Sequence, residues 1–433
     1  MFHTQGLKTS LIDSVYDRTN FRTEFRFQPD QIYLSNMRLL NLGVVASQLD
    51  TAQPYNYLVG SYGVVRQISL MDGNETLSNM VDFNRYSAFK SFTTKNDVST
   101  SVQHFLQQNG LDYVYTDVDV FDASGNSIQY GKIEELFSAG NITTDEPTSS
   151  KGWLSLRDCV PFLSASQYVP TNIFRNLRLV VEYDTLNSSY ANFAATTFTT
   201  NEPFLVADMM VNSKVANQLM MEYKGLSWVD VETDRMVLKP VELVLETNPN
   251  PVQSENFLVN GFNNKRVNRV VMVNVPTSLL TYKSDDDINA VGYTKFANMG
   301  SMGMLKQSVQ VVLNGSNLFT EPIDTANKRL ASVVDNYGDA VCPLGYGNYE
   351  GLTGLVDNSV ETLNNTDYTV FSLGGARVQE LVIQYQRTGQ HEAGVSGSQT
   401  LRRYNQQLFL VLYAEVQKTM VVGNGGKYVI GYA

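Results

Sequence analysis

Two stretches of the chain decide the fold, because they are nearly the same. Arg175–Thr185 reads RNLRLVVEYDT and Arg377–Arg387 reads RVQELVIQYQR, and the two align without a gap. Both have the alternation of a half-buried β-strand, in which successive side chains point to opposite faces. One such match arises easily by chance, because strands use few residue types. A duplicated domain should therefore repeat further elements in the same order.

Further elements do repeat upstream of each strand. An apolar run, a turn dipeptide and a helix-like stretch come in the same order in both places, with Asp72-Gly73 at one turn and Asn314-Gly315 at the other. Asp-Gly and Asn-Gly are strong hairpin signals, because these residues tolerate the positive φ that a tight turn needs. The repetition of three ordered elements indicates a duplication.

We therefore predict two homologous β domains in tandem. A repeat distance of about 200 residues has the size of a whole domain, whereas solenoids and propellers repeat after about 20 to 50 residues. We expect the first residues to form an arm or a short helix. The predicted division is an N-terminal arm over 1–20, a first domain over 21–207, a connector over 208–235 and a second domain over 236–433.

The pattern along the chain favours an all-β fold. Many short alternating segments are separated by turn signals, and helical patterns are confined to short inserts such as Met80–Asn109 and Thr325–Tyr337. This pattern is typical of β-sandwiches and jelly rolls. Rossmann and barrel enzymes would show a regular alternation of strands and helices, which the chain lacks.

The composition restricts the classes of partner. Of the 433 residues, 43% are hydrophobic and only 17% are charged, against roughly a quarter in an average domain. A surface poor in charge suits a protein that buries it against copies of itself, and it equally suits an ordinary β protein with an uncharged polar surface. The net charge of −11 argues against direct contact with nucleic acid, which requires a basic face.

The sequence also indicates where the protein resides. The first residues contain no apolar segment typical of a signal peptide, and the run Leu408–Ala414 near the end is far too short to span a membrane. The two cysteines, Cys159 and Cys342, are too few for a disulfide framework. We therefore expect a reducing compartment rather than secretion.

A search for catalytic motifs finds none. The three histidines, His3, His104 and His391, lie apart from each other and from both cysteines, which argues against a zinc site or a histidine-activated nucleophile. The sequence contains no Gly-x-Ser-x-Gly elbow, no Gly-x-Gly-x-x-Gly after a strand and no Walker loop. We predict a protein that is not an enzyme, with no catalytic residue and no cofactor.

The best candidate metal ligands are Asp117, Asp119 and Asp122. Calcium requires several oxygen ligands that converge on one loop. Here Asp117 and Asp119 alternate with valines, as on the solvent face of a strand, and no acid follows at the closing position of an EF-hand loop. We therefore predict no metal site, although the sequence leaves open whether these aspartates bind an ion.

An ordered set of segments resembles one known family. These segments are TEFRFQPDQIYLSNMRLLNLGV (Thr23–Val44), ISLMDGNETL followed by FNRY, GWLSLRDCVPFL followed by VPTNIFRNLRLVVEY, and VQVVLNGSNL followed by TANKRLASVVDNYGD. Together they are similar to double jelly-roll major capsid proteins, most of all to those of polinton-like viruses and virophages. The resemblance extends from about residue 10 to the end of the chain.

The resemblance implies two tandem eight-stranded jelly rolls with short helical inserts, whose strands stand perpendicular to a capsid surface. It implies a homotrimer of six jelly rolls, a pseudo-hexagonal capsomer that tiles an icosahedral shell beside neighbouring capsomers, penton proteins and minor capsid proteins. Residues 122–151 and 338–365 would form outward-facing or intersubunit loops. The arm over residues 1–20 would lie inside, where contact with a membrane or with neighbouring capsomers is expected. The protein would belong to a virion assembled inside the host cell.

A second function stays open at this point. The 24 tyrosines and 21 phenylalanines could include an exposed platform that stacks on sugars, as in a carbohydrate-binding or carbohydrate-hydrolysing β-sandwich protein. Tyrosines more commonly lie at strand edges and interfaces, because one end of the ring is apolar and the other polar. Trimers in solution would support the capsid hypothesis, and glycan binding would support the alternative.

Overall fold

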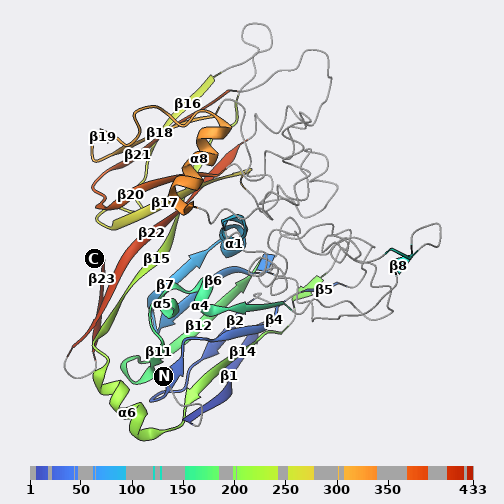
Figure 1. Cartoon of the computed structure of the whole chain (residues 1–433), viewed down its shortest axis with the longest axis vertical. Helices are drawn as coiled ribbons and strands as arrows, with labels where there is room; N and C mark the ends of the chain where they lie inside the picture. The colour runs from blue at the N-terminus through green and yellow to red at the C-terminus, as the bar shows by residue number, and fades with distance from the viewer. Residues whose placement is uncertain are drawn as a thin grey trace.

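The computed structural model contains two stacked β units (Figure 1). The second unit lies above the first, and the helix α1 lies between them. The residues that the structure describes are 6–17, 22–42, 44–46, 62–63, 65–93, 120–121, 127–128, 152–184, 198–200, 202–241, 252–276, 301, 307–338, 368–388, 407–423 and 427–432.

The first unit is built from eight main strands in two sheets. One sheet has the order β10-β4-β14-β1 and the other has the order β2-β12-β6-β7. Their bounds are β1 Leu7–Asp17, β2 Arg22–Arg26, β4 Arg38–Leu42, β6 Val65–Asp72, β7 Glu75–Val81, β10 Gly152–Ser155, β12 Leu177–Tyr183 and β14 Phe204–Met210.

The strand β1 joins these two sheets. Its first half, Leu7 to Ile12, pairs with β14, and its second half, Asp13 to Asp17, pairs with β2. The sequence prediction of an arm or a short helix over residues 1–20 is therefore wrong for Leu7–Asp17. A strand that changes sheets halfway changes its buried face as well, so it has no single alternation that the sequence could reveal.

The second unit repeats the same arrangement. Its sheets have the orders β20-β17-β22-β15, with β23 added beside β22, and β16-β21-β18-β19. Their bounds are β15 Gly225–Leu238, β16 Val252–Leu258, β17 Arg266–Pro276, β18 Ser308–Leu313, β19 Ser316–Asn317, β20 Thr369–Arg377, β21 Leu381–Thr388, β22 Leu408–Val422 and β23 Tyr428–Tyr432. Strands at corresponding places in the chain occupy corresponding places in the sheets. The prediction of two tandem eight-stranded jelly rolls is confirmed.

Short helices and minor strands complete the fold. The longer helices are α1 (Phe83–Phe92), α6 (Ser213–Glu222) and α8 (Ala326–Tyr337), and the minor elements are α4 (Leu156–Cys159), α5 (Pro161–Ser164), η3 (Thr171–Ile173), β3 (Ile32–Leu34), β5 (Val44–Ala46), β8 (Val120–Phe121), β9 (Ser127–Ile128), β11 (Tyr168–Pro170) and β13 (Phe198–Thr200). The predicted connector, 208–235, contains α6 and most of β15. The predicted loops at 122–151 and 338–365 lie outside the described residues, except for β9 and Gly338.

Strand register shows that the two copies correspond residue by residue. Leu179 in β12 pairs with Leu70 in β6, and its counterpart Leu381 in β21 pairs with Leu313 in β18. The helix N-cap then follows at the same distance along the chain, at Asp82 after Leu70 and at Thr325 after Leu313.

The two hairpin turns do not lie at matching positions: one begins three residues after Leu70, and the other begins one residue after Leu313. In the second copy the turn is Asn314-Gly315, both with positive φ (49° and 81°), as predicted. In the first copy Asp72 still pairs with Glu75, so the turn is Gly73-Asn74 and lies one residue later than the sequence suggested.

In both hairpins a side-chain oxygen at the turn accepts hydrogen bonds from the backbone of a distant segment. The side chain of Asp72 accepts a hydrogen bond from the backbone N–H of Asn176 at 2.6 Å. The side chain of Asn314 accepts from the N–H groups of Gln379 and Glu380 at 2.8 and 3.1 Å. In each copy the bond fixes the chain just before the strand of the duplicated sequence, which explains why an Asx residue ends both hairpins.

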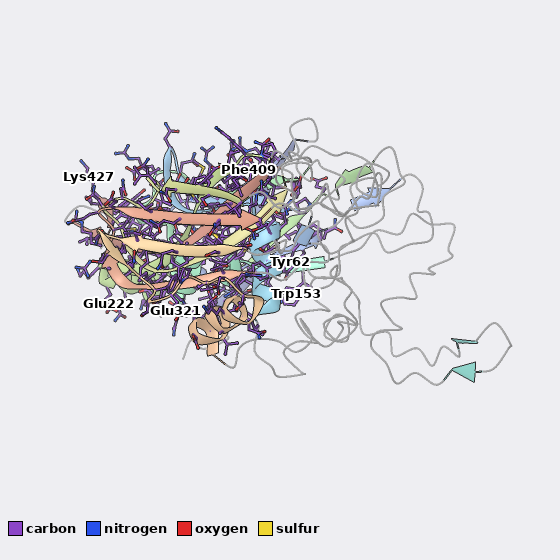
Figure 2. The ribbon with its side chains drawn as sticks, turned by 90° about the horizontal axis from the view of Figure 1, so that it is seen from above. Tyr62, Trp153, Glu222, Glu321, Phe409 and Lys427 are labelled. Carbon is purple, nitrogen blue, oxygen red and sulfur yellow. The ribbon has the colours of Figure 1, made fainter. Side chains whose placement is uncertain are left out.

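One continuous core joins the two units. The largest cluster of buried side chains contains Phe25 and Leu179 of the first unit together with Val271 and Tyr413 of the second. A separate cluster lies between the two sheets of the second unit. Side chains fill the layers between the sheets, with Tyr62 close to Trp153, whose carbonyl it contacts at 3.0 Å (Figure 2).

We predict that Asn314→Ala lowers the free energy of unfolding by about 2 kcal/mol. It removes two accepted hydrogen bonds, each worth about 1 kcal/mol, and places a Cβ without a polar group at positive φ. Asn314→Gly loses the same two hydrogen bonds, but it removes the Cβ from a positive-φ position, which offsets about 1 kcal/mol, so its net loss should be only about 1 kcal/mol. Chemical denaturation measures both. The exposed Asn317→Ala is the control, and a loss as large as that of Asn314→Ala would contradict the assignment.

Candidate functional site

The residues singled out in the sequence do not form a site in the part of the chain that the structure describes. Asp117, Asp119 and Asp122 lie outside the described residues, as do all three histidines and Cys342. Cys159 is buried, with its Sγ 3.5 Å from the carbonyl oxygen of Ser155. This contact with the backbone is that of a structural thiol.

The residues that the structure describes contain no group of three or more His, Cys, Asp or Glu side chains that could hold a metal ion. None of their helices is long and apolar enough to cross a membrane. What the structure does bring together from distant parts of the sequence is the contact between the two jelly rolls.

Aromatic side chains form the centre of this contact. Phe89 of α1 packs edge-on against Tyr368, at 5.0 Å between ring centroids, and against Tyr337 at the end of α8, at 5.3 Å. Tyr86, one turn earlier, lies 5.2 Å from Tyr413 in β22. Buried aromatic pairs contribute about 0.5–1.5 kcal/mol each beyond the area that they remove from water. The helix α1 is therefore an anchor between the units.

The contact continues along the twisted ribbon of β15, β22 and β23. Phe162 of α5 meets Trp228 of β15 edge-on at 5.2 Å. Phe174 lies 5.4 Å from Tyr428, whose hydroxyl donates to Asp72 at 2.7 Å. The ribbon thereby covers the open edge of the first jelly roll, beside β7 and α5.

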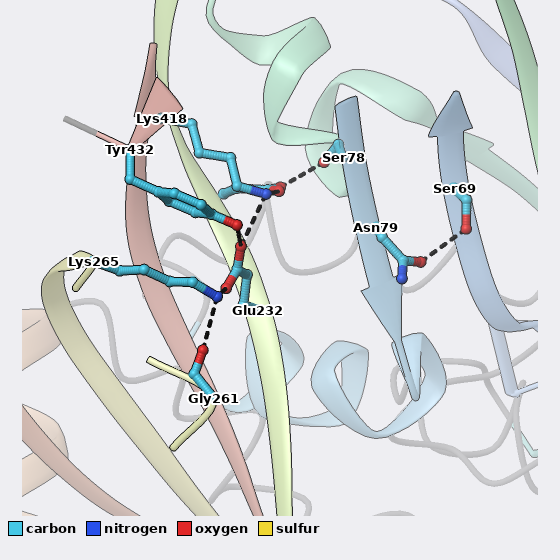
Figure 3. Close-up of polar contacts among 9 residues, drawn as sticks. Ser69, Ser78, Asn79, Glu232, Gly261, Lys265, Lys418 and Tyr432 are labelled. Carbon is cyan, nitrogen blue, oxygen red and sulfur yellow. Dashed lines mark hydrogen bonds and ion pairs between the residues drawn. The ribbon is translucent and has the colours of Figure 1, made fainter. Parts of the chain in front are cut away.

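A buried ion pair lies at the border between the units (Figure 3). Asp230 of β15 is only 1% exposed. Its carboxylate accepts a bond from Lys418 Nζ at 2.6 Å and another from Ser78 Oγ of the first unit at 2.5 Å. Because a buried charge is stable only when it is paired and hydrogen-bonded, Ser78 makes the pair depend on the first jelly roll.

The same lysine belongs to a larger network. Lys418 lies 3.0 Å from Glu232, which also accepts from Lys265 Nζ at 2.5 Å and from the hydroxyl of Tyr432 at 3.1 Å (Figure 3). The Nζ of Lys265 donates in addition to the carbonyl of Gly261 at 2.7 Å. The network ties β15, β22, β23 and the turn before β17 to one another.

The network shifts the pKa values of its members. Burial alone would raise the pKa of Glu232, but Lys418 and Lys265 outweigh it and hold the pKa below its ordinary value of 4.5. Burial would lower the pKa of Lys418, but Asp230 and Glu232 outweigh it and raise the pKa. Burial raises the pKa of Asp230 more than its partners lower it. Lys418 and Glu232 are therefore charged at neutral pH.

A second ionic contact joins the units at the start of α1. Asp82, the N-cap residue, forms an ion pair with Arg235 of β15. The carbonyl of Asp82 also accepts from the hydroxyl of Tyr413 at 3.2 Å. The beginning of α1 is thus fixed to two strands of the second unit.

The outer face of the sheet β16-β21-β18 is free of charge. It consists of three rows of directly paired residues, all exposed or half-buried: Leu258, Val382 and Val312; Asn256, Gln384 and Gln310; Ser254, Gln386 and Ser308. Amide and apolar side chains lose less solvation free energy than charged ones when they are covered, so this face is suited to contact with another protein.

The corresponding face of the first unit is different. There the row Arg22, Glu182 and Gln67 takes the place of Asn256, Gln384 and Gln310. Glu24 lies nearby and forms ion pairs with Arg26 at 2.8 Å and with Arg178 at 3.2 Å. The duplicated domains have thus kept their strand pairing while the chemistry of this face has changed.

Sequence reasoning missed the buried pair, although one signal exists. In GLSWVDVETDRMVL the acids Asp230 and Glu232 lie an even number of residues from the buried Trp228 and Met236, and therefore on the same side of the strand. An acid on the apolar side of a strand indicates a buried partner. The partner itself, Lys418, lies 188 residues away, and no local pattern identifies it.

These observations define a class of protein. Two jelly rolls of identical strand order, fused by a shared core, form a double jelly roll. In Figure 2 the long strands of the second unit extend between the end labelled Phe409 and the end labelled Lys427.

Several solved structures that are similar to this chain come from virus or virophage particles. The chain is similar to the PBCV-1 protein VP54 fitted into a reconstruction of the virophage Sputnik (TM-score 0.59, 8% identity, 100% of this chain and 98% of that one). It is similar to a chain of the Sputnik virophage structure (0.53, 9%, 99% and 88%) and to the mavirus major capsid protein (0.50, 8%, 99% and 90%). No family model and no curated protein matches the sequence. The resemblance to double jelly-roll major capsid proteins is confirmed as a likeness of fold.

We predict that Lys418→Met destabilises the protein by about 3 kcal/mol, because it leaves the carboxylate of Asp230 buried without its cation. Adding Asp230→Asn should restore much of the loss, because the amide needs no counter-ion. Urea denaturation measures both variants. Lys328→Met is the control: Lys328 pairs with Asp324 at the surface, where ion pairs contribute about 0–1 kcal/mol. Equal losses in Lys418→Met and Lys328→Met would contradict the prediction.

The lowered pKa of Glu232 predicts a pH dependence. A carboxylate with a lowered pKa in the folded state stabilises the protein above its unfolded pKa, and this contribution is lost as the pH falls through the folded pKa. The difference in unfolding free energy between the wild type and Glu232→Gln should therefore be largest above pH 4.5 and shrink at lower pH. Denaturation series at several pH values measure it. A difference that is constant with pH would show that the ionisation of Glu232 does not contribute.

Proposed function

We propose that this protein is a structural subunit of a viral capsid, not an enzyme. The observation that carries the proposal is the likeness over the whole chain to capsid structures such as the PBCV-1 virus capsid and the mavirus major capsid protein. One fold can serve many functions. The proposal therefore also depends on what the surface and the core of this chain are suited to do.

The construction of the molecule suits a mechanical role. A shared aromatic core and a buried ion pair fuse the jelly rolls into one block, which can transmit force across a shell without bending between its halves. The uncharged face of β16-β21-β18 can be covered by a neighbour at little cost in solvation. The alternative of a carbohydrate-binding or carbohydrate-hydrolysing protein gains no support from the structural neighbours named above.

In this proposal three copies form a homotrimer with six jelly rolls, and the trimers tile an icosahedral shell with their strands perpendicular to its surface. Neighbouring capsomers, penton proteins and minor capsid proteins are the partners, and the protein resides in a virion assembled inside the host cell. We place no membrane contact at Leu7–Asp17, because β1 is committed to two sheets.

The purified chain should be a trimer of three times 48.4 kDa at micromolar concentration. Mass photometry gives the mass, and negative-stain images should show hexagonal outlines. Because we expect contacts poor in charge, the trimer should persist at about 1 M salt, where the Debye length is only about 3 Å. A strictly monomeric protein at these concentrations would rule the proposal out.

A further inference from the structure

The internal contact between the two jelly rolls joins unlike surfaces. The first unit contributes α1 and the edge strand β7, and the second contributes the outer face of β17 and β22. On that face Val271, Val273, Val411 and Tyr413 are all buried, in one cluster with residues of the first unit. A contact between unlike surfaces of two homologous units is head-to-tail. It leaves the corresponding sheet face of the first unit and the corresponding helix surface of the second unit without a partner.

The unused sheet face lies on the first unit. β4, β14 and β1 correspond to β17, β22 and β15, and in Figure 1 they lie on the side of the first jelly roll away from the second. Their inward residues Leu39, Leu205 and Ile12 are buried. We name four of their outward residues, Leu11, Val206, Phe204 and Leu40, the sheet patch; the exposed Arg38, which pairs with Val206, borders it on β4.

The sheet patch is apolar although it is uncovered in the single chain. Leu11 is 66% exposed and Phe204 is 41% exposed, while Val206 and Leu40 are half-buried. Direct pairing of Leu11 with Val206 and of Phe204 with Leu40 makes the patch contiguous. The corresponding face of the second unit is apolar because α1 covers it, so the apolar character of the sheet patch indicates a cover of the same kind.

The matching helix of the second unit, α8, takes part in the internal contact through Val333 and Tyr337, but part of its surface stays uncovered. By its place in the chain and its N-cap, α8 is the counterpart of α1. Its outward residues Leu330 and Val334 are 39% and 41% exposed and lie one turn apart on the same face of the helix. We name them the helix patch.

Different positions along α1 and α8 face away from their own jelly rolls, and the contacts of α8 explain the difference. Arg329 and Ser332 stand where α1 has Tyr86 and Phe89. Arg329 donates to the carbonyl of Gln307, and the Ser332 hydroxyl accepts from the N–H of Val370, so both residues turn toward their own unit. This rotation leaves Leu330 and Val334 on the outward face of α8.

We propose that the helix patch of one copy docks on the sheet patch of a second copy of this chain, and so repeats between molecules the contact that α1 makes within one. The occupant is a second copy because each chain carries both an uncovered sheet patch and an uncovered helix patch. The sheet patch corresponds to the face that α1 covers within the molecule, and the helix patch lies on the counterpart of α1. A head-to-tail contact between copies closes into a ring when the rotation allows it. The inference rests on the proposed function and states which surfaces hold the capsomer together.

Three variants of the full chain test the proposal. The sheet variant is Leu11→Glu with Phe204→Glu, and the helix variant is Leu330→Glu with Val334→Glu. The control is Val421→Glu with Val429→Glu, at residues that are 58% and 72% exposed and belong to neither patch. Circular dichroism and thermal unfolding check that each variant folds, and the gentler Leu11→Ser with Phe204→Ser replaces the sheet variant if it does not.

The sheet and helix variants should each be monomeric, with the dissociation constant of the contact raised on the order of 100-fold or more, while the control keeps the wild-type mass. Mixing the two variants gives the sharpest result. Each retains the surface that the other lacks, so native mass spectrometry, with one variant isotopically labelled, should find heterodimers that do not close into rings.

The other outcomes are equally clear. If either variant keeps the wild-type mass, or if the control dissociates as they do, the assigned surfaces are wrong while the capsid proposal stands. If the mixture yields no heterodimer, the contact is not head-to-tail between these patches. If the wild type itself is monomeric, the capsid proposal fails, and the two failures are thereby distinguished.

Discussion

The structure depends on one sheet that is buried on both faces. In β22, Leu410 and Leu412 point into the core of the second jelly roll, whereas Val411 and Tyr413 belong to the core shared with the first. A large apolar side chain that is removed from water contributes about 1.5–3 kcal/mol, so separating the jelly rolls would expose a full face of this sheet. The two units therefore stay together for the same reason that each one folds.

Apolar burial joins the units, and the charged groups specify how they meet. The pair of Asp230 and Lys418 gains little net stability, because desolvating two charges offsets most of their attraction. Its value lies in geometry: Asp230 reaches its second partner, Ser78, only in one alignment of β15 on β7. An aromatic contact tolerates sliding, whereas a buried carboxylate that loses a partner does not.

The sequence was informative where structure is local and repeated. Arg175–Thr185 and its counterpart predicted the duplication, because a strand of fixed alternation keeps its register in both copies. β1 escaped prediction because it serves two sheets, and α6 escaped although Asn212 caps it. Contacts between distant strands, above all Asp230 with Lys418, have no local signature. The sheet patch could not be predicted either, because the sequence pattern does not distinguish an exposed leucine from a buried one.

Residue-resolved hydrogen exchange on the wild type and Phe89→Ala tests most directly whether the jelly rolls form one cooperative body. Phe89 belongs to the first unit and contacts the second at Tyr337 and Tyr368. If the core is shared, the substitution should reduce the protection of β12 and β22 by the same free energy, because both open in one event. Loss of protection in one jelly roll alone, with the other unchanged, would contradict the account.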